Sequence, residues 1–295
     1  MSIEYGGDGA GGASPQAFAF SQDCEAGGDY KIRAVGVGKT FSVRGKRGKG
    51  VTQTEALDGL TLSIPRGEFH VILGPSGCGK STFLDLVAGL AKATAGEILI
   101  DGKPVAGPGT DRAMVFQQYA LLPWKTALGN VEFALEGLER DRRRRRETAT
   151  KYLELVGLGE FLGHHPFELS GGMKQRVAIA RALAIGSDVL LMDEPFAAVD
   201  ALTREVLQRD LLRIAREAGK TVLFITHSID EAVFLADRVS VMSPRPGRIK
   251  EIVPVPISRG DRMRGDVKAS EPYARVRHRL WELMREDAAQ IAASG

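Results

Sequence analysis

The residues from Gly74 to Ser81 have the types and the spacing that bind nucleotide phosphates. They read Gly-Pro-Ser-Gly-Cys-Gly-Lys-Ser, which fits the P-loop pattern of two glycines separated by four residues and followed by Lys and a hydroxyl residue. The glycines let successive backbone N–H groups turn toward the phosphates, while Lys80 reaches the terminal phosphates and the Ser81 hydroxyl coordinates Mg²⁺. The residues expected to bind ATP in this loop are Gly74, Ser76, Gly77, Cys78, Gly79, Lys80, Ser81 and Thr82.

An apolar stretch that ends in two carboxylates supplies the acidic groups that this chemistry needs. Val189–Met192 has the length and composition of a buried strand, and Asp193 and Glu194 follow it directly. Asp193 can hold Mg²⁺ through water, which leaves Glu194 to act as the general base on an attacking water. An Asp-Glu pair alone is usually a solvated turn, but together with a P-loop it predicts phosphate hydrolysis.

A third segment distinguishes among the many enzymes that use a P-loop. Residues 169–176 read Leu-Ser-Gly-Gly-Met-Lys-Gln-Arg, in which Ser170 is a good helix cap and two glycines leave room for an anion. Here the chain resembles the ABC transporter ATPases, whose signature is Leu-Ser-Gly-Gly followed by a Gln-Arg helix. A P-loop kinase would explain neither this segment nor His227.

The resemblance implies roles for further residues, in the order in which the family carries them. Gln117 is expected to contact Mg²⁺ and the attacking water, Asp200 to form the D-loop, and His227 to contact the γ-phosphate. Phe41 is the candidate for stacking on adenine, with Tyr30 as the alternative. The catalytic residues expected on this basis are Lys80, Gln117, Glu194 and His227. Outside the P-loop, the nucleotide is expected to contact Phe41, Gln117, Ser170, Gly171, Gly172 and Asp200, and Mg²⁺ is expected at Ser81, Gln117 and Asp193.

Some positions depart from the pattern that is common in the family. Ala197 and Val199 stand in the D-loop where Gly or Ser and Leu are frequent, and Ser228 follows the histidine where Asp is common. His70 occupies a strand position that is usually apolar. None of these changes removes a catalytic group, so ATPase activity is still expected. The property that they could alter is the coupling between two cassettes.

Short apolar runs that alternate with helical stretches must position these groups. Besides residues 189–192, the expected strands are Ile32–Val37, Leu57–Ile64, Phe69–Leu73, Val222–Thr226 and Val239–Met242. The P-loop is expected to lead into a helix at Thr82–Leu90, and a strand–loop–helix unit of this kind begins a parallel sheet. The sequence therefore predicts the α/β class, with the ligand at the carboxyl ends of the strands.

The resemblance divides the chain into three parts. It implies a P-loop ABC cassette over residues 29–260, with a RecA-like core, an antiparallel β subdomain and a helical subdomain at about 122–185. Residues 1–28 are rich in Gly, Ala and Ser and predict a disordered leader. Residues 261–295 are expected to form a helical tail, whose apolar residues recur at steps of three to four at Tyr273, Val276, Leu280 and Met284.

The composition of the 295-residue chain limits the class of protein. Hydrophobic residues make up 43% and charged residues 26%, and a net charge of +3 gives no argument for a nucleic-acid partner. No apolar stretch approaches the roughly 20 residues that span a bilayer. No basic segment leads into an apolar one near the start, so no secretory signal is expected. Cys24 and Cys78 do not look like parts of a disulfide or a zinc site.

The family implies two cassettes packed head to tail, with each ATP between the P-loop of one and the signature of the other. A chain with one P-loop and one signature cannot complete a site alone, so a homodimer, or a heterodimer with a similar cassette, is expected. A transmembrane permease would convert ATP-driven closure into transport, at the cytoplasmic face of the plasma membrane.

Three short segments point to a class of importer. They are Leu122-Pro-Trp124, Asp58-Gly-Leu with Glu68-Phe69, and Arg245-Pro-Gly-Arg248-Ile249. Together they resemble importers of the nitrate, sulfonate and taurine class, which receive substrate from an extracytoplasmic binding protein. Importers for bicarbonate or thiamin-precursor pyrimidines are the alternative. The transported substrate cannot be predicted from this chain, because the ATPase subunit does not contact it.

Two further alternatives are open at this stage. An ABC ATPase that acts on ribosomes or DNA would carry two cassettes or a long coiled coil, and the chain has neither pattern. The arginines of Arg140–Arg146 fit either a solvated helix start or a contact with anionic lipid headgroups, and Arg44–Lys49 has the same two interpretations.

Overall fold

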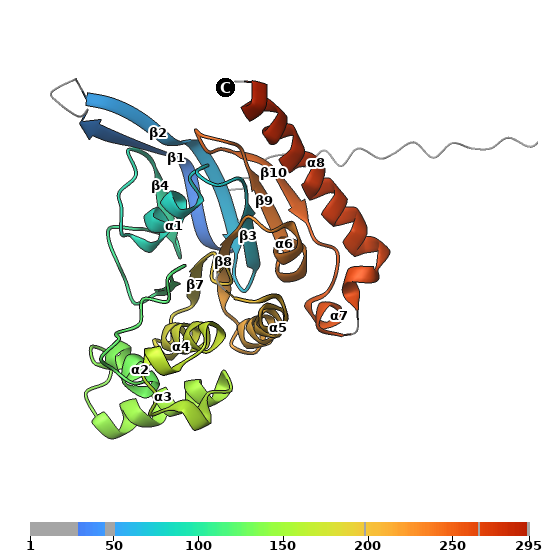
Figure 1. Cartoon of the computed structure of the whole chain (residues 1–295). Helices are drawn as coiled ribbons and strands as arrows, with labels where there is room; N and C mark the ends of the chain where they lie inside the picture. Colours follow the sequence, from blue (N-terminus) through green and yellow to red (C-terminus); the bar gives the residue numbers. More distant parts are fainter. Residues whose placement is uncertain (1–28, 45–50, 198, 265, 294–295) are drawn as a thin grey trace, which may run out of the picture.

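A six-stranded, mostly parallel sheet lies at the centre of the computed structural model, which describes residues 29–44, 51–197, 199–264 and 266–293. Its strand order is β10-β9-β3-β8-β7-β6, with β10 antiparallel at one edge (Figure 1). The strands are β3 (Phe69–Leu73), β6 (Arg112–Val115), β7 (Val189–Asp193), β8 (Thr221–Thr226), β9 (Arg238–Met242) and β10 (Ile249–Pro254). The predicted α/β class and parallel sheet are confirmed.

Alternate residues of these strands enter two separate apolar cores, one on each face of the sheet. Val71 and Leu190 belong to one core, and their neighbours Ile72 and Leu191 belong to the other. Successive side chains of a strand point to opposite faces, so a strand buried on both sides must be apolar throughout. This explains why the strands read as continuous apolar runs in the sequence.

A second, antiparallel sheet packs over one face, in the order β2-β1-β4-β5. It consists of β1 (Tyr30–Arg44), β2 (Val51–Pro65), β4 (Ala95–Ile100) and β5 (Lys103–Pro104). The first two strands extend well beyond the predicted Ile32–Val37 and Leu57–Ile64. In the extension, polar residues such as Thr40 and Glu55 pair with each other. This part of the two strands is therefore held together by backbone hydrogen bonds and has no alternating apolar pattern that the sequence could show.

Helix α1 (Lys80–Ala88) lies between the two sheets, with Phe83, Leu84 and Val87 buried. It begins two residues earlier and ends two residues earlier than the predicted Thr82–Leu90. The end is fixed by Gly89, whose φ of 77° is left-handed. A Cβ there would lie 2.2 Å from the carbonyl oxygen of Gly107, so no other residue fits.

The predicted change to helical structure after Leu122 is present, and these helices lie below the parallel sheet in Figure 1. They are α2 (Ala127–Leu135), α3 (Arg142–Leu155) and α4 (Gly171–Ala184), with 3₁₀ turns η2 (Gly159–Phe161) and η3 (Pro166–Glu168). Buried Asn130 fixes the loop before α2, since its side chain bonds both the N–H and the carbonyl of Leu122, at 2.7 and 3.2 Å.

The arginine run begins α3, where the Asp141 carboxylate accepts a 2.8 Å hydrogen bond from the N–H of Arg143. Arg142–Arg146 thus form a largely exposed helix start, although cations are disfavoured at this end of the helix dipole. Arg143 pairs with Glu147 at 2.9 Å. The lipid contact stays a prediction, and residues 45–50 of the other basic stretch lie outside the described residues.

The parallel sheet has the antiparallel sheet on one face, and its other face is covered by helices from the second half of the chain. They are α5 (Ala201–Glu217), α6 (Ile229–Leu235), α7 (Arg259–Met263) and α8 (Glu271–Ala293), with the 3₁₀ turn η4 (Val267–Ala269) between the last two. The predicted apolar face of α8 is confirmed, because Tyr273, Val276 and Leu280 are buried and Met284 is partly so.

Asp237, just before β9, joins the base of the P-loop strand to the C-terminal segment. Its carboxylate accepts the N–H of Phe69 at 2.9 Å, Nε of Arg259 at 3.0 Å and Nη2 of Arg262 at 2.8 Å. Burial raises the pKa of Asp237 and the Arg259 and Phe69 hydrogen bonds lower it, with a net shift below the ordinary value. Arg262, only 1% exposed, also bonds the carbonyls of Phe234 and Ala236.

Strands β4, β5, β6 and β10 were not predicted. The sequence of β6, Arg-Ala-Met-Val, is too short for a pattern, and β10 interrupts its apolar residues with Lys250 and Glu251. The predicted leader, residues 1–28, lies outside the described residues. Within the described ranges, no helix is both long enough and apolar enough to cross a membrane.

Candidate nucleotide site

The P-loop lies where β3 ends and α1 begins, as the sequence predicts. Gly77 and Gly79 take left-handed backbone conformations, with φ of 79° and 106°. A Cβ on Gly79 would also come within 2.8 Å of the carbonyl oxygen of Ala56 in β2. The loop therefore needs glycine both for its turn and for its contact with the antiparallel sheet. The resulting curl directs the first N–H groups of α1 into the loop, where they can bind an anion.

Lys80 is held across this loop and is only 5% exposed. Its Nζ donates to the carbonyl oxygens of Gly74 and Pro75, at 2.8 and 2.9 Å, and lies 4.0 Å from Oε1 of Glu194. The ammonium group is thus fixed between the loop and the end of β7. A phosphate in the loop would add a charged partner, besides Glu194, to a cation whose hydrogen bonds go to two neutral carbonyls.

Ser81 and Asp193 meet at the expected Mg²⁺ position. The Ser81 hydroxyl donates to Oδ1 of Asp193 at 3.1 Å, although the two residues are 112 positions apart. Burial raises the pKa of the Asp193 carboxyl, and the Ser81 hydrogen bond opposes that rise. A hydroxyl beside a carboxylate is an oxygen donor pair that suits Mg²⁺. Among the described residues, no group of three or more His, Cys, Asp or Glu could hold a metal ion.

Glu194 and His227 form a second pair at the ends of neighbouring strands β7 and β8. Nδ1 of His227 lies 2.8 Å from Oε2 of Glu194, and the Glu194 N–H donates to the carbonyl of Ile225 at 3.1 Å. Glu194 has φ of 42°, a left-handed value that is costly for a residue with a side chain. The strained backbone therefore belongs to the residue whose carboxylate, oriented by the His227 imidazole, can act as a general base.

Glu231 is a functional candidate that the sequence analysis missed. It is 7% exposed in the first turn of α6, and its Oε2 accepts the hydroxyl of Thr226 at 2.6 Å, one residue before His227. Burial raises the pKa of this carboxyl, and the Thr226 hydrogen bond opposes the rise. Glu231 therefore fixes the strand end that carries the histidine. Only its place four residues after His227 could have suggested it.

Gln117 and Phe41 lie at the periphery of this arrangement. Gln117 is exposed two residues beyond β6, which pairs in parallel with β7, so it follows the strand next to Asp193. Phe41 is 43% exposed on β1, with the Lys39 ammonium 5.1 Å from its ring centroid. Its neighbour Lys39 pairs with Leu57, which adjoins the P-loop, whereas Tyr30 pairs with Pro65 at the far end of β1. This geometry favours Phe41 over Tyr30.

The signature segment occupies a different part of the molecule, at the start of α4. Ser170 caps the helix by accepting the N–H of Met173 at 3.3 Å. A Cβ on Gly172 would lie 2.6 Å from Cγ2 of Thr203, so the signature packs directly against α5. Asp200 caps α5 by accepting the N–H of Thr203 at 3.0 Å, and such hydrogen bonds lower the pKa of its carboxyl.

Comparison with known sequences gives a consistent family. Residues 57–197 match the family model described as ABC transporter. The chain is 51% identical over 229 residues to an uncharacterized ABC transporter ATP-binding protein of Methanocaldococcus jannaschii, which covers 78% of this chain and 84% of that protein. It is 50% identical to the taurine import ATP-binding protein TauB of Rhizobium johnstonii, over 76% of this chain and 87% of that protein. It is 48% identical to the nitrate import ATP-binding protein NrtD of Synechococcus elongatus, covering 82% and 86%.

Solved structures agree with this family. The dimeric, post-hydrolysis ATP-binding cassette MJ0796 bound to ADP and Pi aligns with a TM-score of 0.66 and 35% identity, covering 79% of this chain and 99% of that one. CbiO1 of Clostridium perfringens, part of the ABC transporter complex cbiONQ, aligns with the same TM-score and 28% identity, covering 77% and 89%.

Proposed function

The chain belongs to the ABC transporter family of ATP-binding subunits and is an ATPase of that type; on this premise we propose that it powers an importer of a small anion. The observation that carries the proposal is the near-equal identity, 50% and 48%, to subunits named for taurine import and for nitrate import. Taurine carries a sulfonate group and nitrate is an oxyanion, so both named cargoes are small and present an anionic group with several oxygens.

In the proposed reaction the P-loop N–H groups and Lys80 bind the β- and γ-phosphates of ATP. Ser81 and Asp193 hold Mg²⁺, which when bound neutralises charge that develops on the phosphate oxygens. Glu194 takes a proton from the attacking water, and His227 keeps the Glu194 carboxylate in place at 2.8 Å. The carboxylate then needs no reorganisation at the moment of attack.

Two copies of the chain are proposed to form the working unit. The P-loop and Glu194 belong to the strand ends of the parallel sheet, whereas Ser170 and Gly172 belong to the helical region (Figure 1). ATP bound in the P-loop of one copy would meet the α4 helix end of the other, and its γ-phosphate would bind both faces. Hydrolysis removes that bridge, so the ligand shifts the pair between closed and open states.

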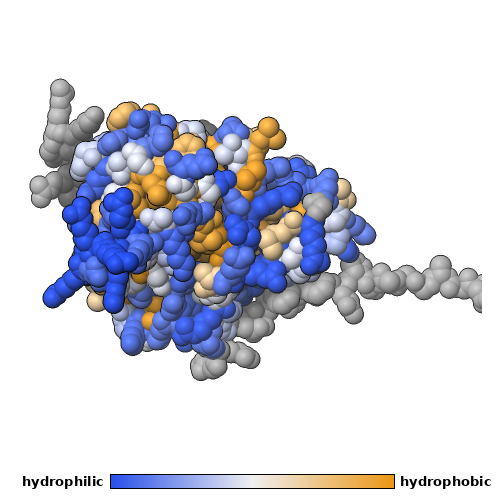
Figure 2. Space-filling view, turned by 90° about the horizontal axis from the view of Figure 1, so that it is seen from below, coloured by the Kyte–Doolittle hydropathy of each residue, from blue (hydrophilic) through white to orange (hydrophobic). Residues whose placement is uncertain are grey.

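Apolar side chains on the helical end of the molecule provide surface for partner subunits. Figure 2, seen from this end, shows apolar patches between the hydrophilic side chains. Among the exposed large apolar residues are Trp124 and Phe133 around α2, Phe167 in η3, and Leu202 and Val206 in α5. Contiguous apolar patches of the kind that Figure 2 shows mark interaction surfaces. We propose that the residues around α2 face the permease, and that α5 faces the second copy.

The location and the further partner follow from the same proposal. A subunit that binds a permease acts as a peripheral protein at the cytoplasmic face of the membrane. The substrate would reach the permease from an extracytoplasmic binding protein, and nucleic acid has no role in this scheme.

The test is the ATPase rate of the chain in proteoliposomes with its genomic-neighbour permease and binding protein. Taurine, longer alkanesulfonates, nitrate, bicarbonate and thiamin-precursor pyrimidines are added one at a time, with the Glu194→Gln variant as the inactive control. Stimulation by a sulfonate or by nitrate supports the proposal and identifies the cargo. Stimulation by a pyrimidine alone, or by no substrate, contradicts the small-anion proposal.

A further inference from the structure

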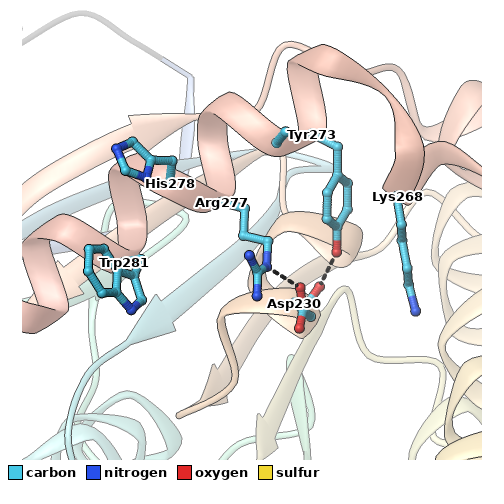
Figure 3. Close-up of a pocket in the computed structure, with 7 residues that line it drawn as sticks. Asp230, Lys268, Tyr273, Arg277, His278 and Trp281 are labelled. Atoms are coloured by element: carbon cyan, nitrogen blue, oxygen red, sulfur yellow. Dashed lines mark hydrogen bonds and ion pairs between the residues drawn. The ribbon is translucent and has the colours of Figure 1, made fainter.

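A groove of about 680 Å³ lies between α6, η4 and α8, outside the nucleotide site (Figure 3). The side chains of Arg277 and Tyr273 converge on Asp230, with Arg277 Nε 3.0 Å from Oδ1 and the Tyr273 hydroxyl donating to the Asp230 carbonyl at 3.1 Å. Lys268 closes one end, where it pairs with Glu205 of α5. The volume lies in the range of small-molecule sites.

The other end of the groove is an aromatic ring flanked by cationic groups. Trp281 is 45% exposed on α8, stacked at 18° against His278 and with the Arg285 guanidinium 4.9 Å from its ring centroid. His278 is itself 3.4 Å from Glu282. Among the described ion pairs, Arg285 has no carboxylate. The groove thus combines an accessible indole with the guanidinium of Arg285, which suits a partner with aromatic rings and carboxylates.

Residues 1–28 of the same chain have that chemistry. Their charged residues are Glu4, Asp8, Asp23 and Glu25, and they contain no Lys, Arg or His. Phe18 and Phe20 stand together just before the last two acids, and Tyr5 is the remaining aromatic residue. The segment therefore offers phenyl rings beside carboxylates to a site that offers an indole beside guanidinium groups.

A series of contacts links Asp29, the first residue that the structure describes, to the wall of this groove. Asp29 pairs with Arg66 at 2.7 Å, and the next residue, Gly67, accepts Nη2 of Arg259 at 2.7 Å. Arg259 begins α7, which packs against η4 and so adjoins Lys268 in the groove wall. A segment of 28 residues can extend roughly 90 Å, and Phe20 alone is nine residues from Asp29, or roughly 30 Å of chain.

We propose that residues 1–28 bind in this groove within the same chain, with Phe18 and Phe20 against Trp281 and the acidic residues next to Lys268, Arg277 and Arg285. The groove includes Asp230 in the first turn of α6, three residues after His227. A bound segment therefore packs against α6, the helix that follows His227. This interaction does not depend on the transported substrate.

Disulfide trapping in the full-length chain tests the proposal directly. The variant Ala19→Cys/Cys24→Ser/Ala274→Cys places one thiol between the two phenylalanines and the other in the groove wall. Under mild oxidation we expect a disulfide within one chain, seen as faster migration on non-reducing gels. The matched control replaces Ala274→Cys with Glu154→Cys, exposed on α3 at the other end of the molecule, and should cross-link far less. Equal cross-linking of the control, no cross-link, or disulfides only between chains would overturn the proposal.

Fluorescence gives a second measurement that needs no new thiol. The chain has two tryptophans, so Trp124→Phe leaves Trp281 as the only indole. Deleting residues 1–28, or changing Phe18→Ser/Phe20→Ser, should increase the acrylamide quenching of Trp281 about twofold, because the ring loses its aromatic cover. In the Trp281→Phe chain, the same changes should leave the quenching of Trp124 as it was. Unchanged quenching of Trp281 would contradict the proposed contact.

Discussion

The two helix ends expected to bind ATP, at α1 and at α4, are built very differently. At α1, Lys80 is 5% exposed, bonded to two loop carbonyls and close to Glu194, and Ser81 bonds Asp193 across 112 residues. At α4, Ser170 is exposed and bonds only the backbone of its own helix. One end is set by long-range contacts within the chain, and the other is an open helix end.

This difference fits the roles that the proposed function gives to the two ends. In that proposal the α1 end brings together the groups for chemistry, which must be positioned closely. The α4 end would only have to meet a phosphate of ATP bound to the other copy, so a capped helix start with glycine is enough. We therefore expect changes at α1 to affect binding or chemistry within one chain, and changes at α4 to affect turnover alone.

The largest effect is expected for Glu194→Gln. The amide keeps the size of the side chain but cannot accept the proton of water, so turnover should fall about 10²- to 10⁴-fold, the usual contribution of a general base. ATP affinity should stay close to that of the wild type, and ATP should trap a closed dimer. Single-turnover hydrolysis and gel filtration with ATP measure both effects. Hydrolysis at the wild-type rate would remove Glu194 from this role.

Lys80→Ala should weaken nucleotide binding itself. Losing charge-assisted hydrogen bonds of about 1.5–3 kcal/mol corresponds to roughly a ten- to hundredfold higher Kd. Equilibrium titration with a fluorescent ATP analogue measures this in the isolated subunit. Ser170→Ala is the matched control at the other helix end and should leave the Kd of the isolated subunit unchanged. An equal loss of ATP affinity in both variants would contradict the prediction that only the α1 end binds ATP in the isolated subunit.

Gly172→Ala should reduce turnover about tenfold, because its Cβ overlaps Cγ2 of Thr203 and overpacking of this kind costs roughly 1–3 kcal/mol. The Kd of the isolated subunit for ATP should not change. Thr203→Ser removes the overlapping methyl and keeps the N–H that donates to Asp200, so the double variant should recover much of the turnover. A fall in ATP affinity that parallels the fall in turnover would contradict this prediction.

The smallest effect is a pH-dependent change in stability at Glu231. Burial raises the native pKa of this carboxyl above its ordinary 4.5, so the native state binds the proton more tightly than the unfolded state. The destabilisation is therefore present above the native pKa and is relieved as the pH falls through it. Glu231→Gln should raise the Tm near neutral pH by about a few °C at most, and the gain should shrink toward acid. Thermal unfolding at several pH values measures it, and a gain independent of pH would exclude this cause.

Much of the site could be predicted from the sequence because its groups adjoin local patterns. The P-loop, Asp193 and His227 each follow a short apolar strand, and the strand ends meet wherever a parallel sheet forms. Ser170 could be predicted as a cap because capping depends on residues within one turn.

The rest depends on contacts that no local pattern carries. Glu231 has its role because Thr226 lies 2.6 Å away, and nothing in its own helix turn distinguishes it from a surface carboxylate. His70 interrupts an apolar strand, yet it is fully buried between Glu68 and Ser240, at 2.6 and 2.8 Å. Strand β4 begins at Ala95, and its pairing with β1 extends to Ile100, a register that only the folded sheet defines.

The Asp237 junction has a practical consequence for anyone who shortens or fuses this protein. Its two arginines come from beyond the last strand, yet they hold the residue that bonds the first N–H of the P-loop strand. A truncation after β10, or a fusion that replaces the C-terminal segment, would leave the partly buried Asp237 carboxylate without these two counter-ions. A chimera that exchanges this cassette between transporters should therefore include the C-terminal segment together with the cassette.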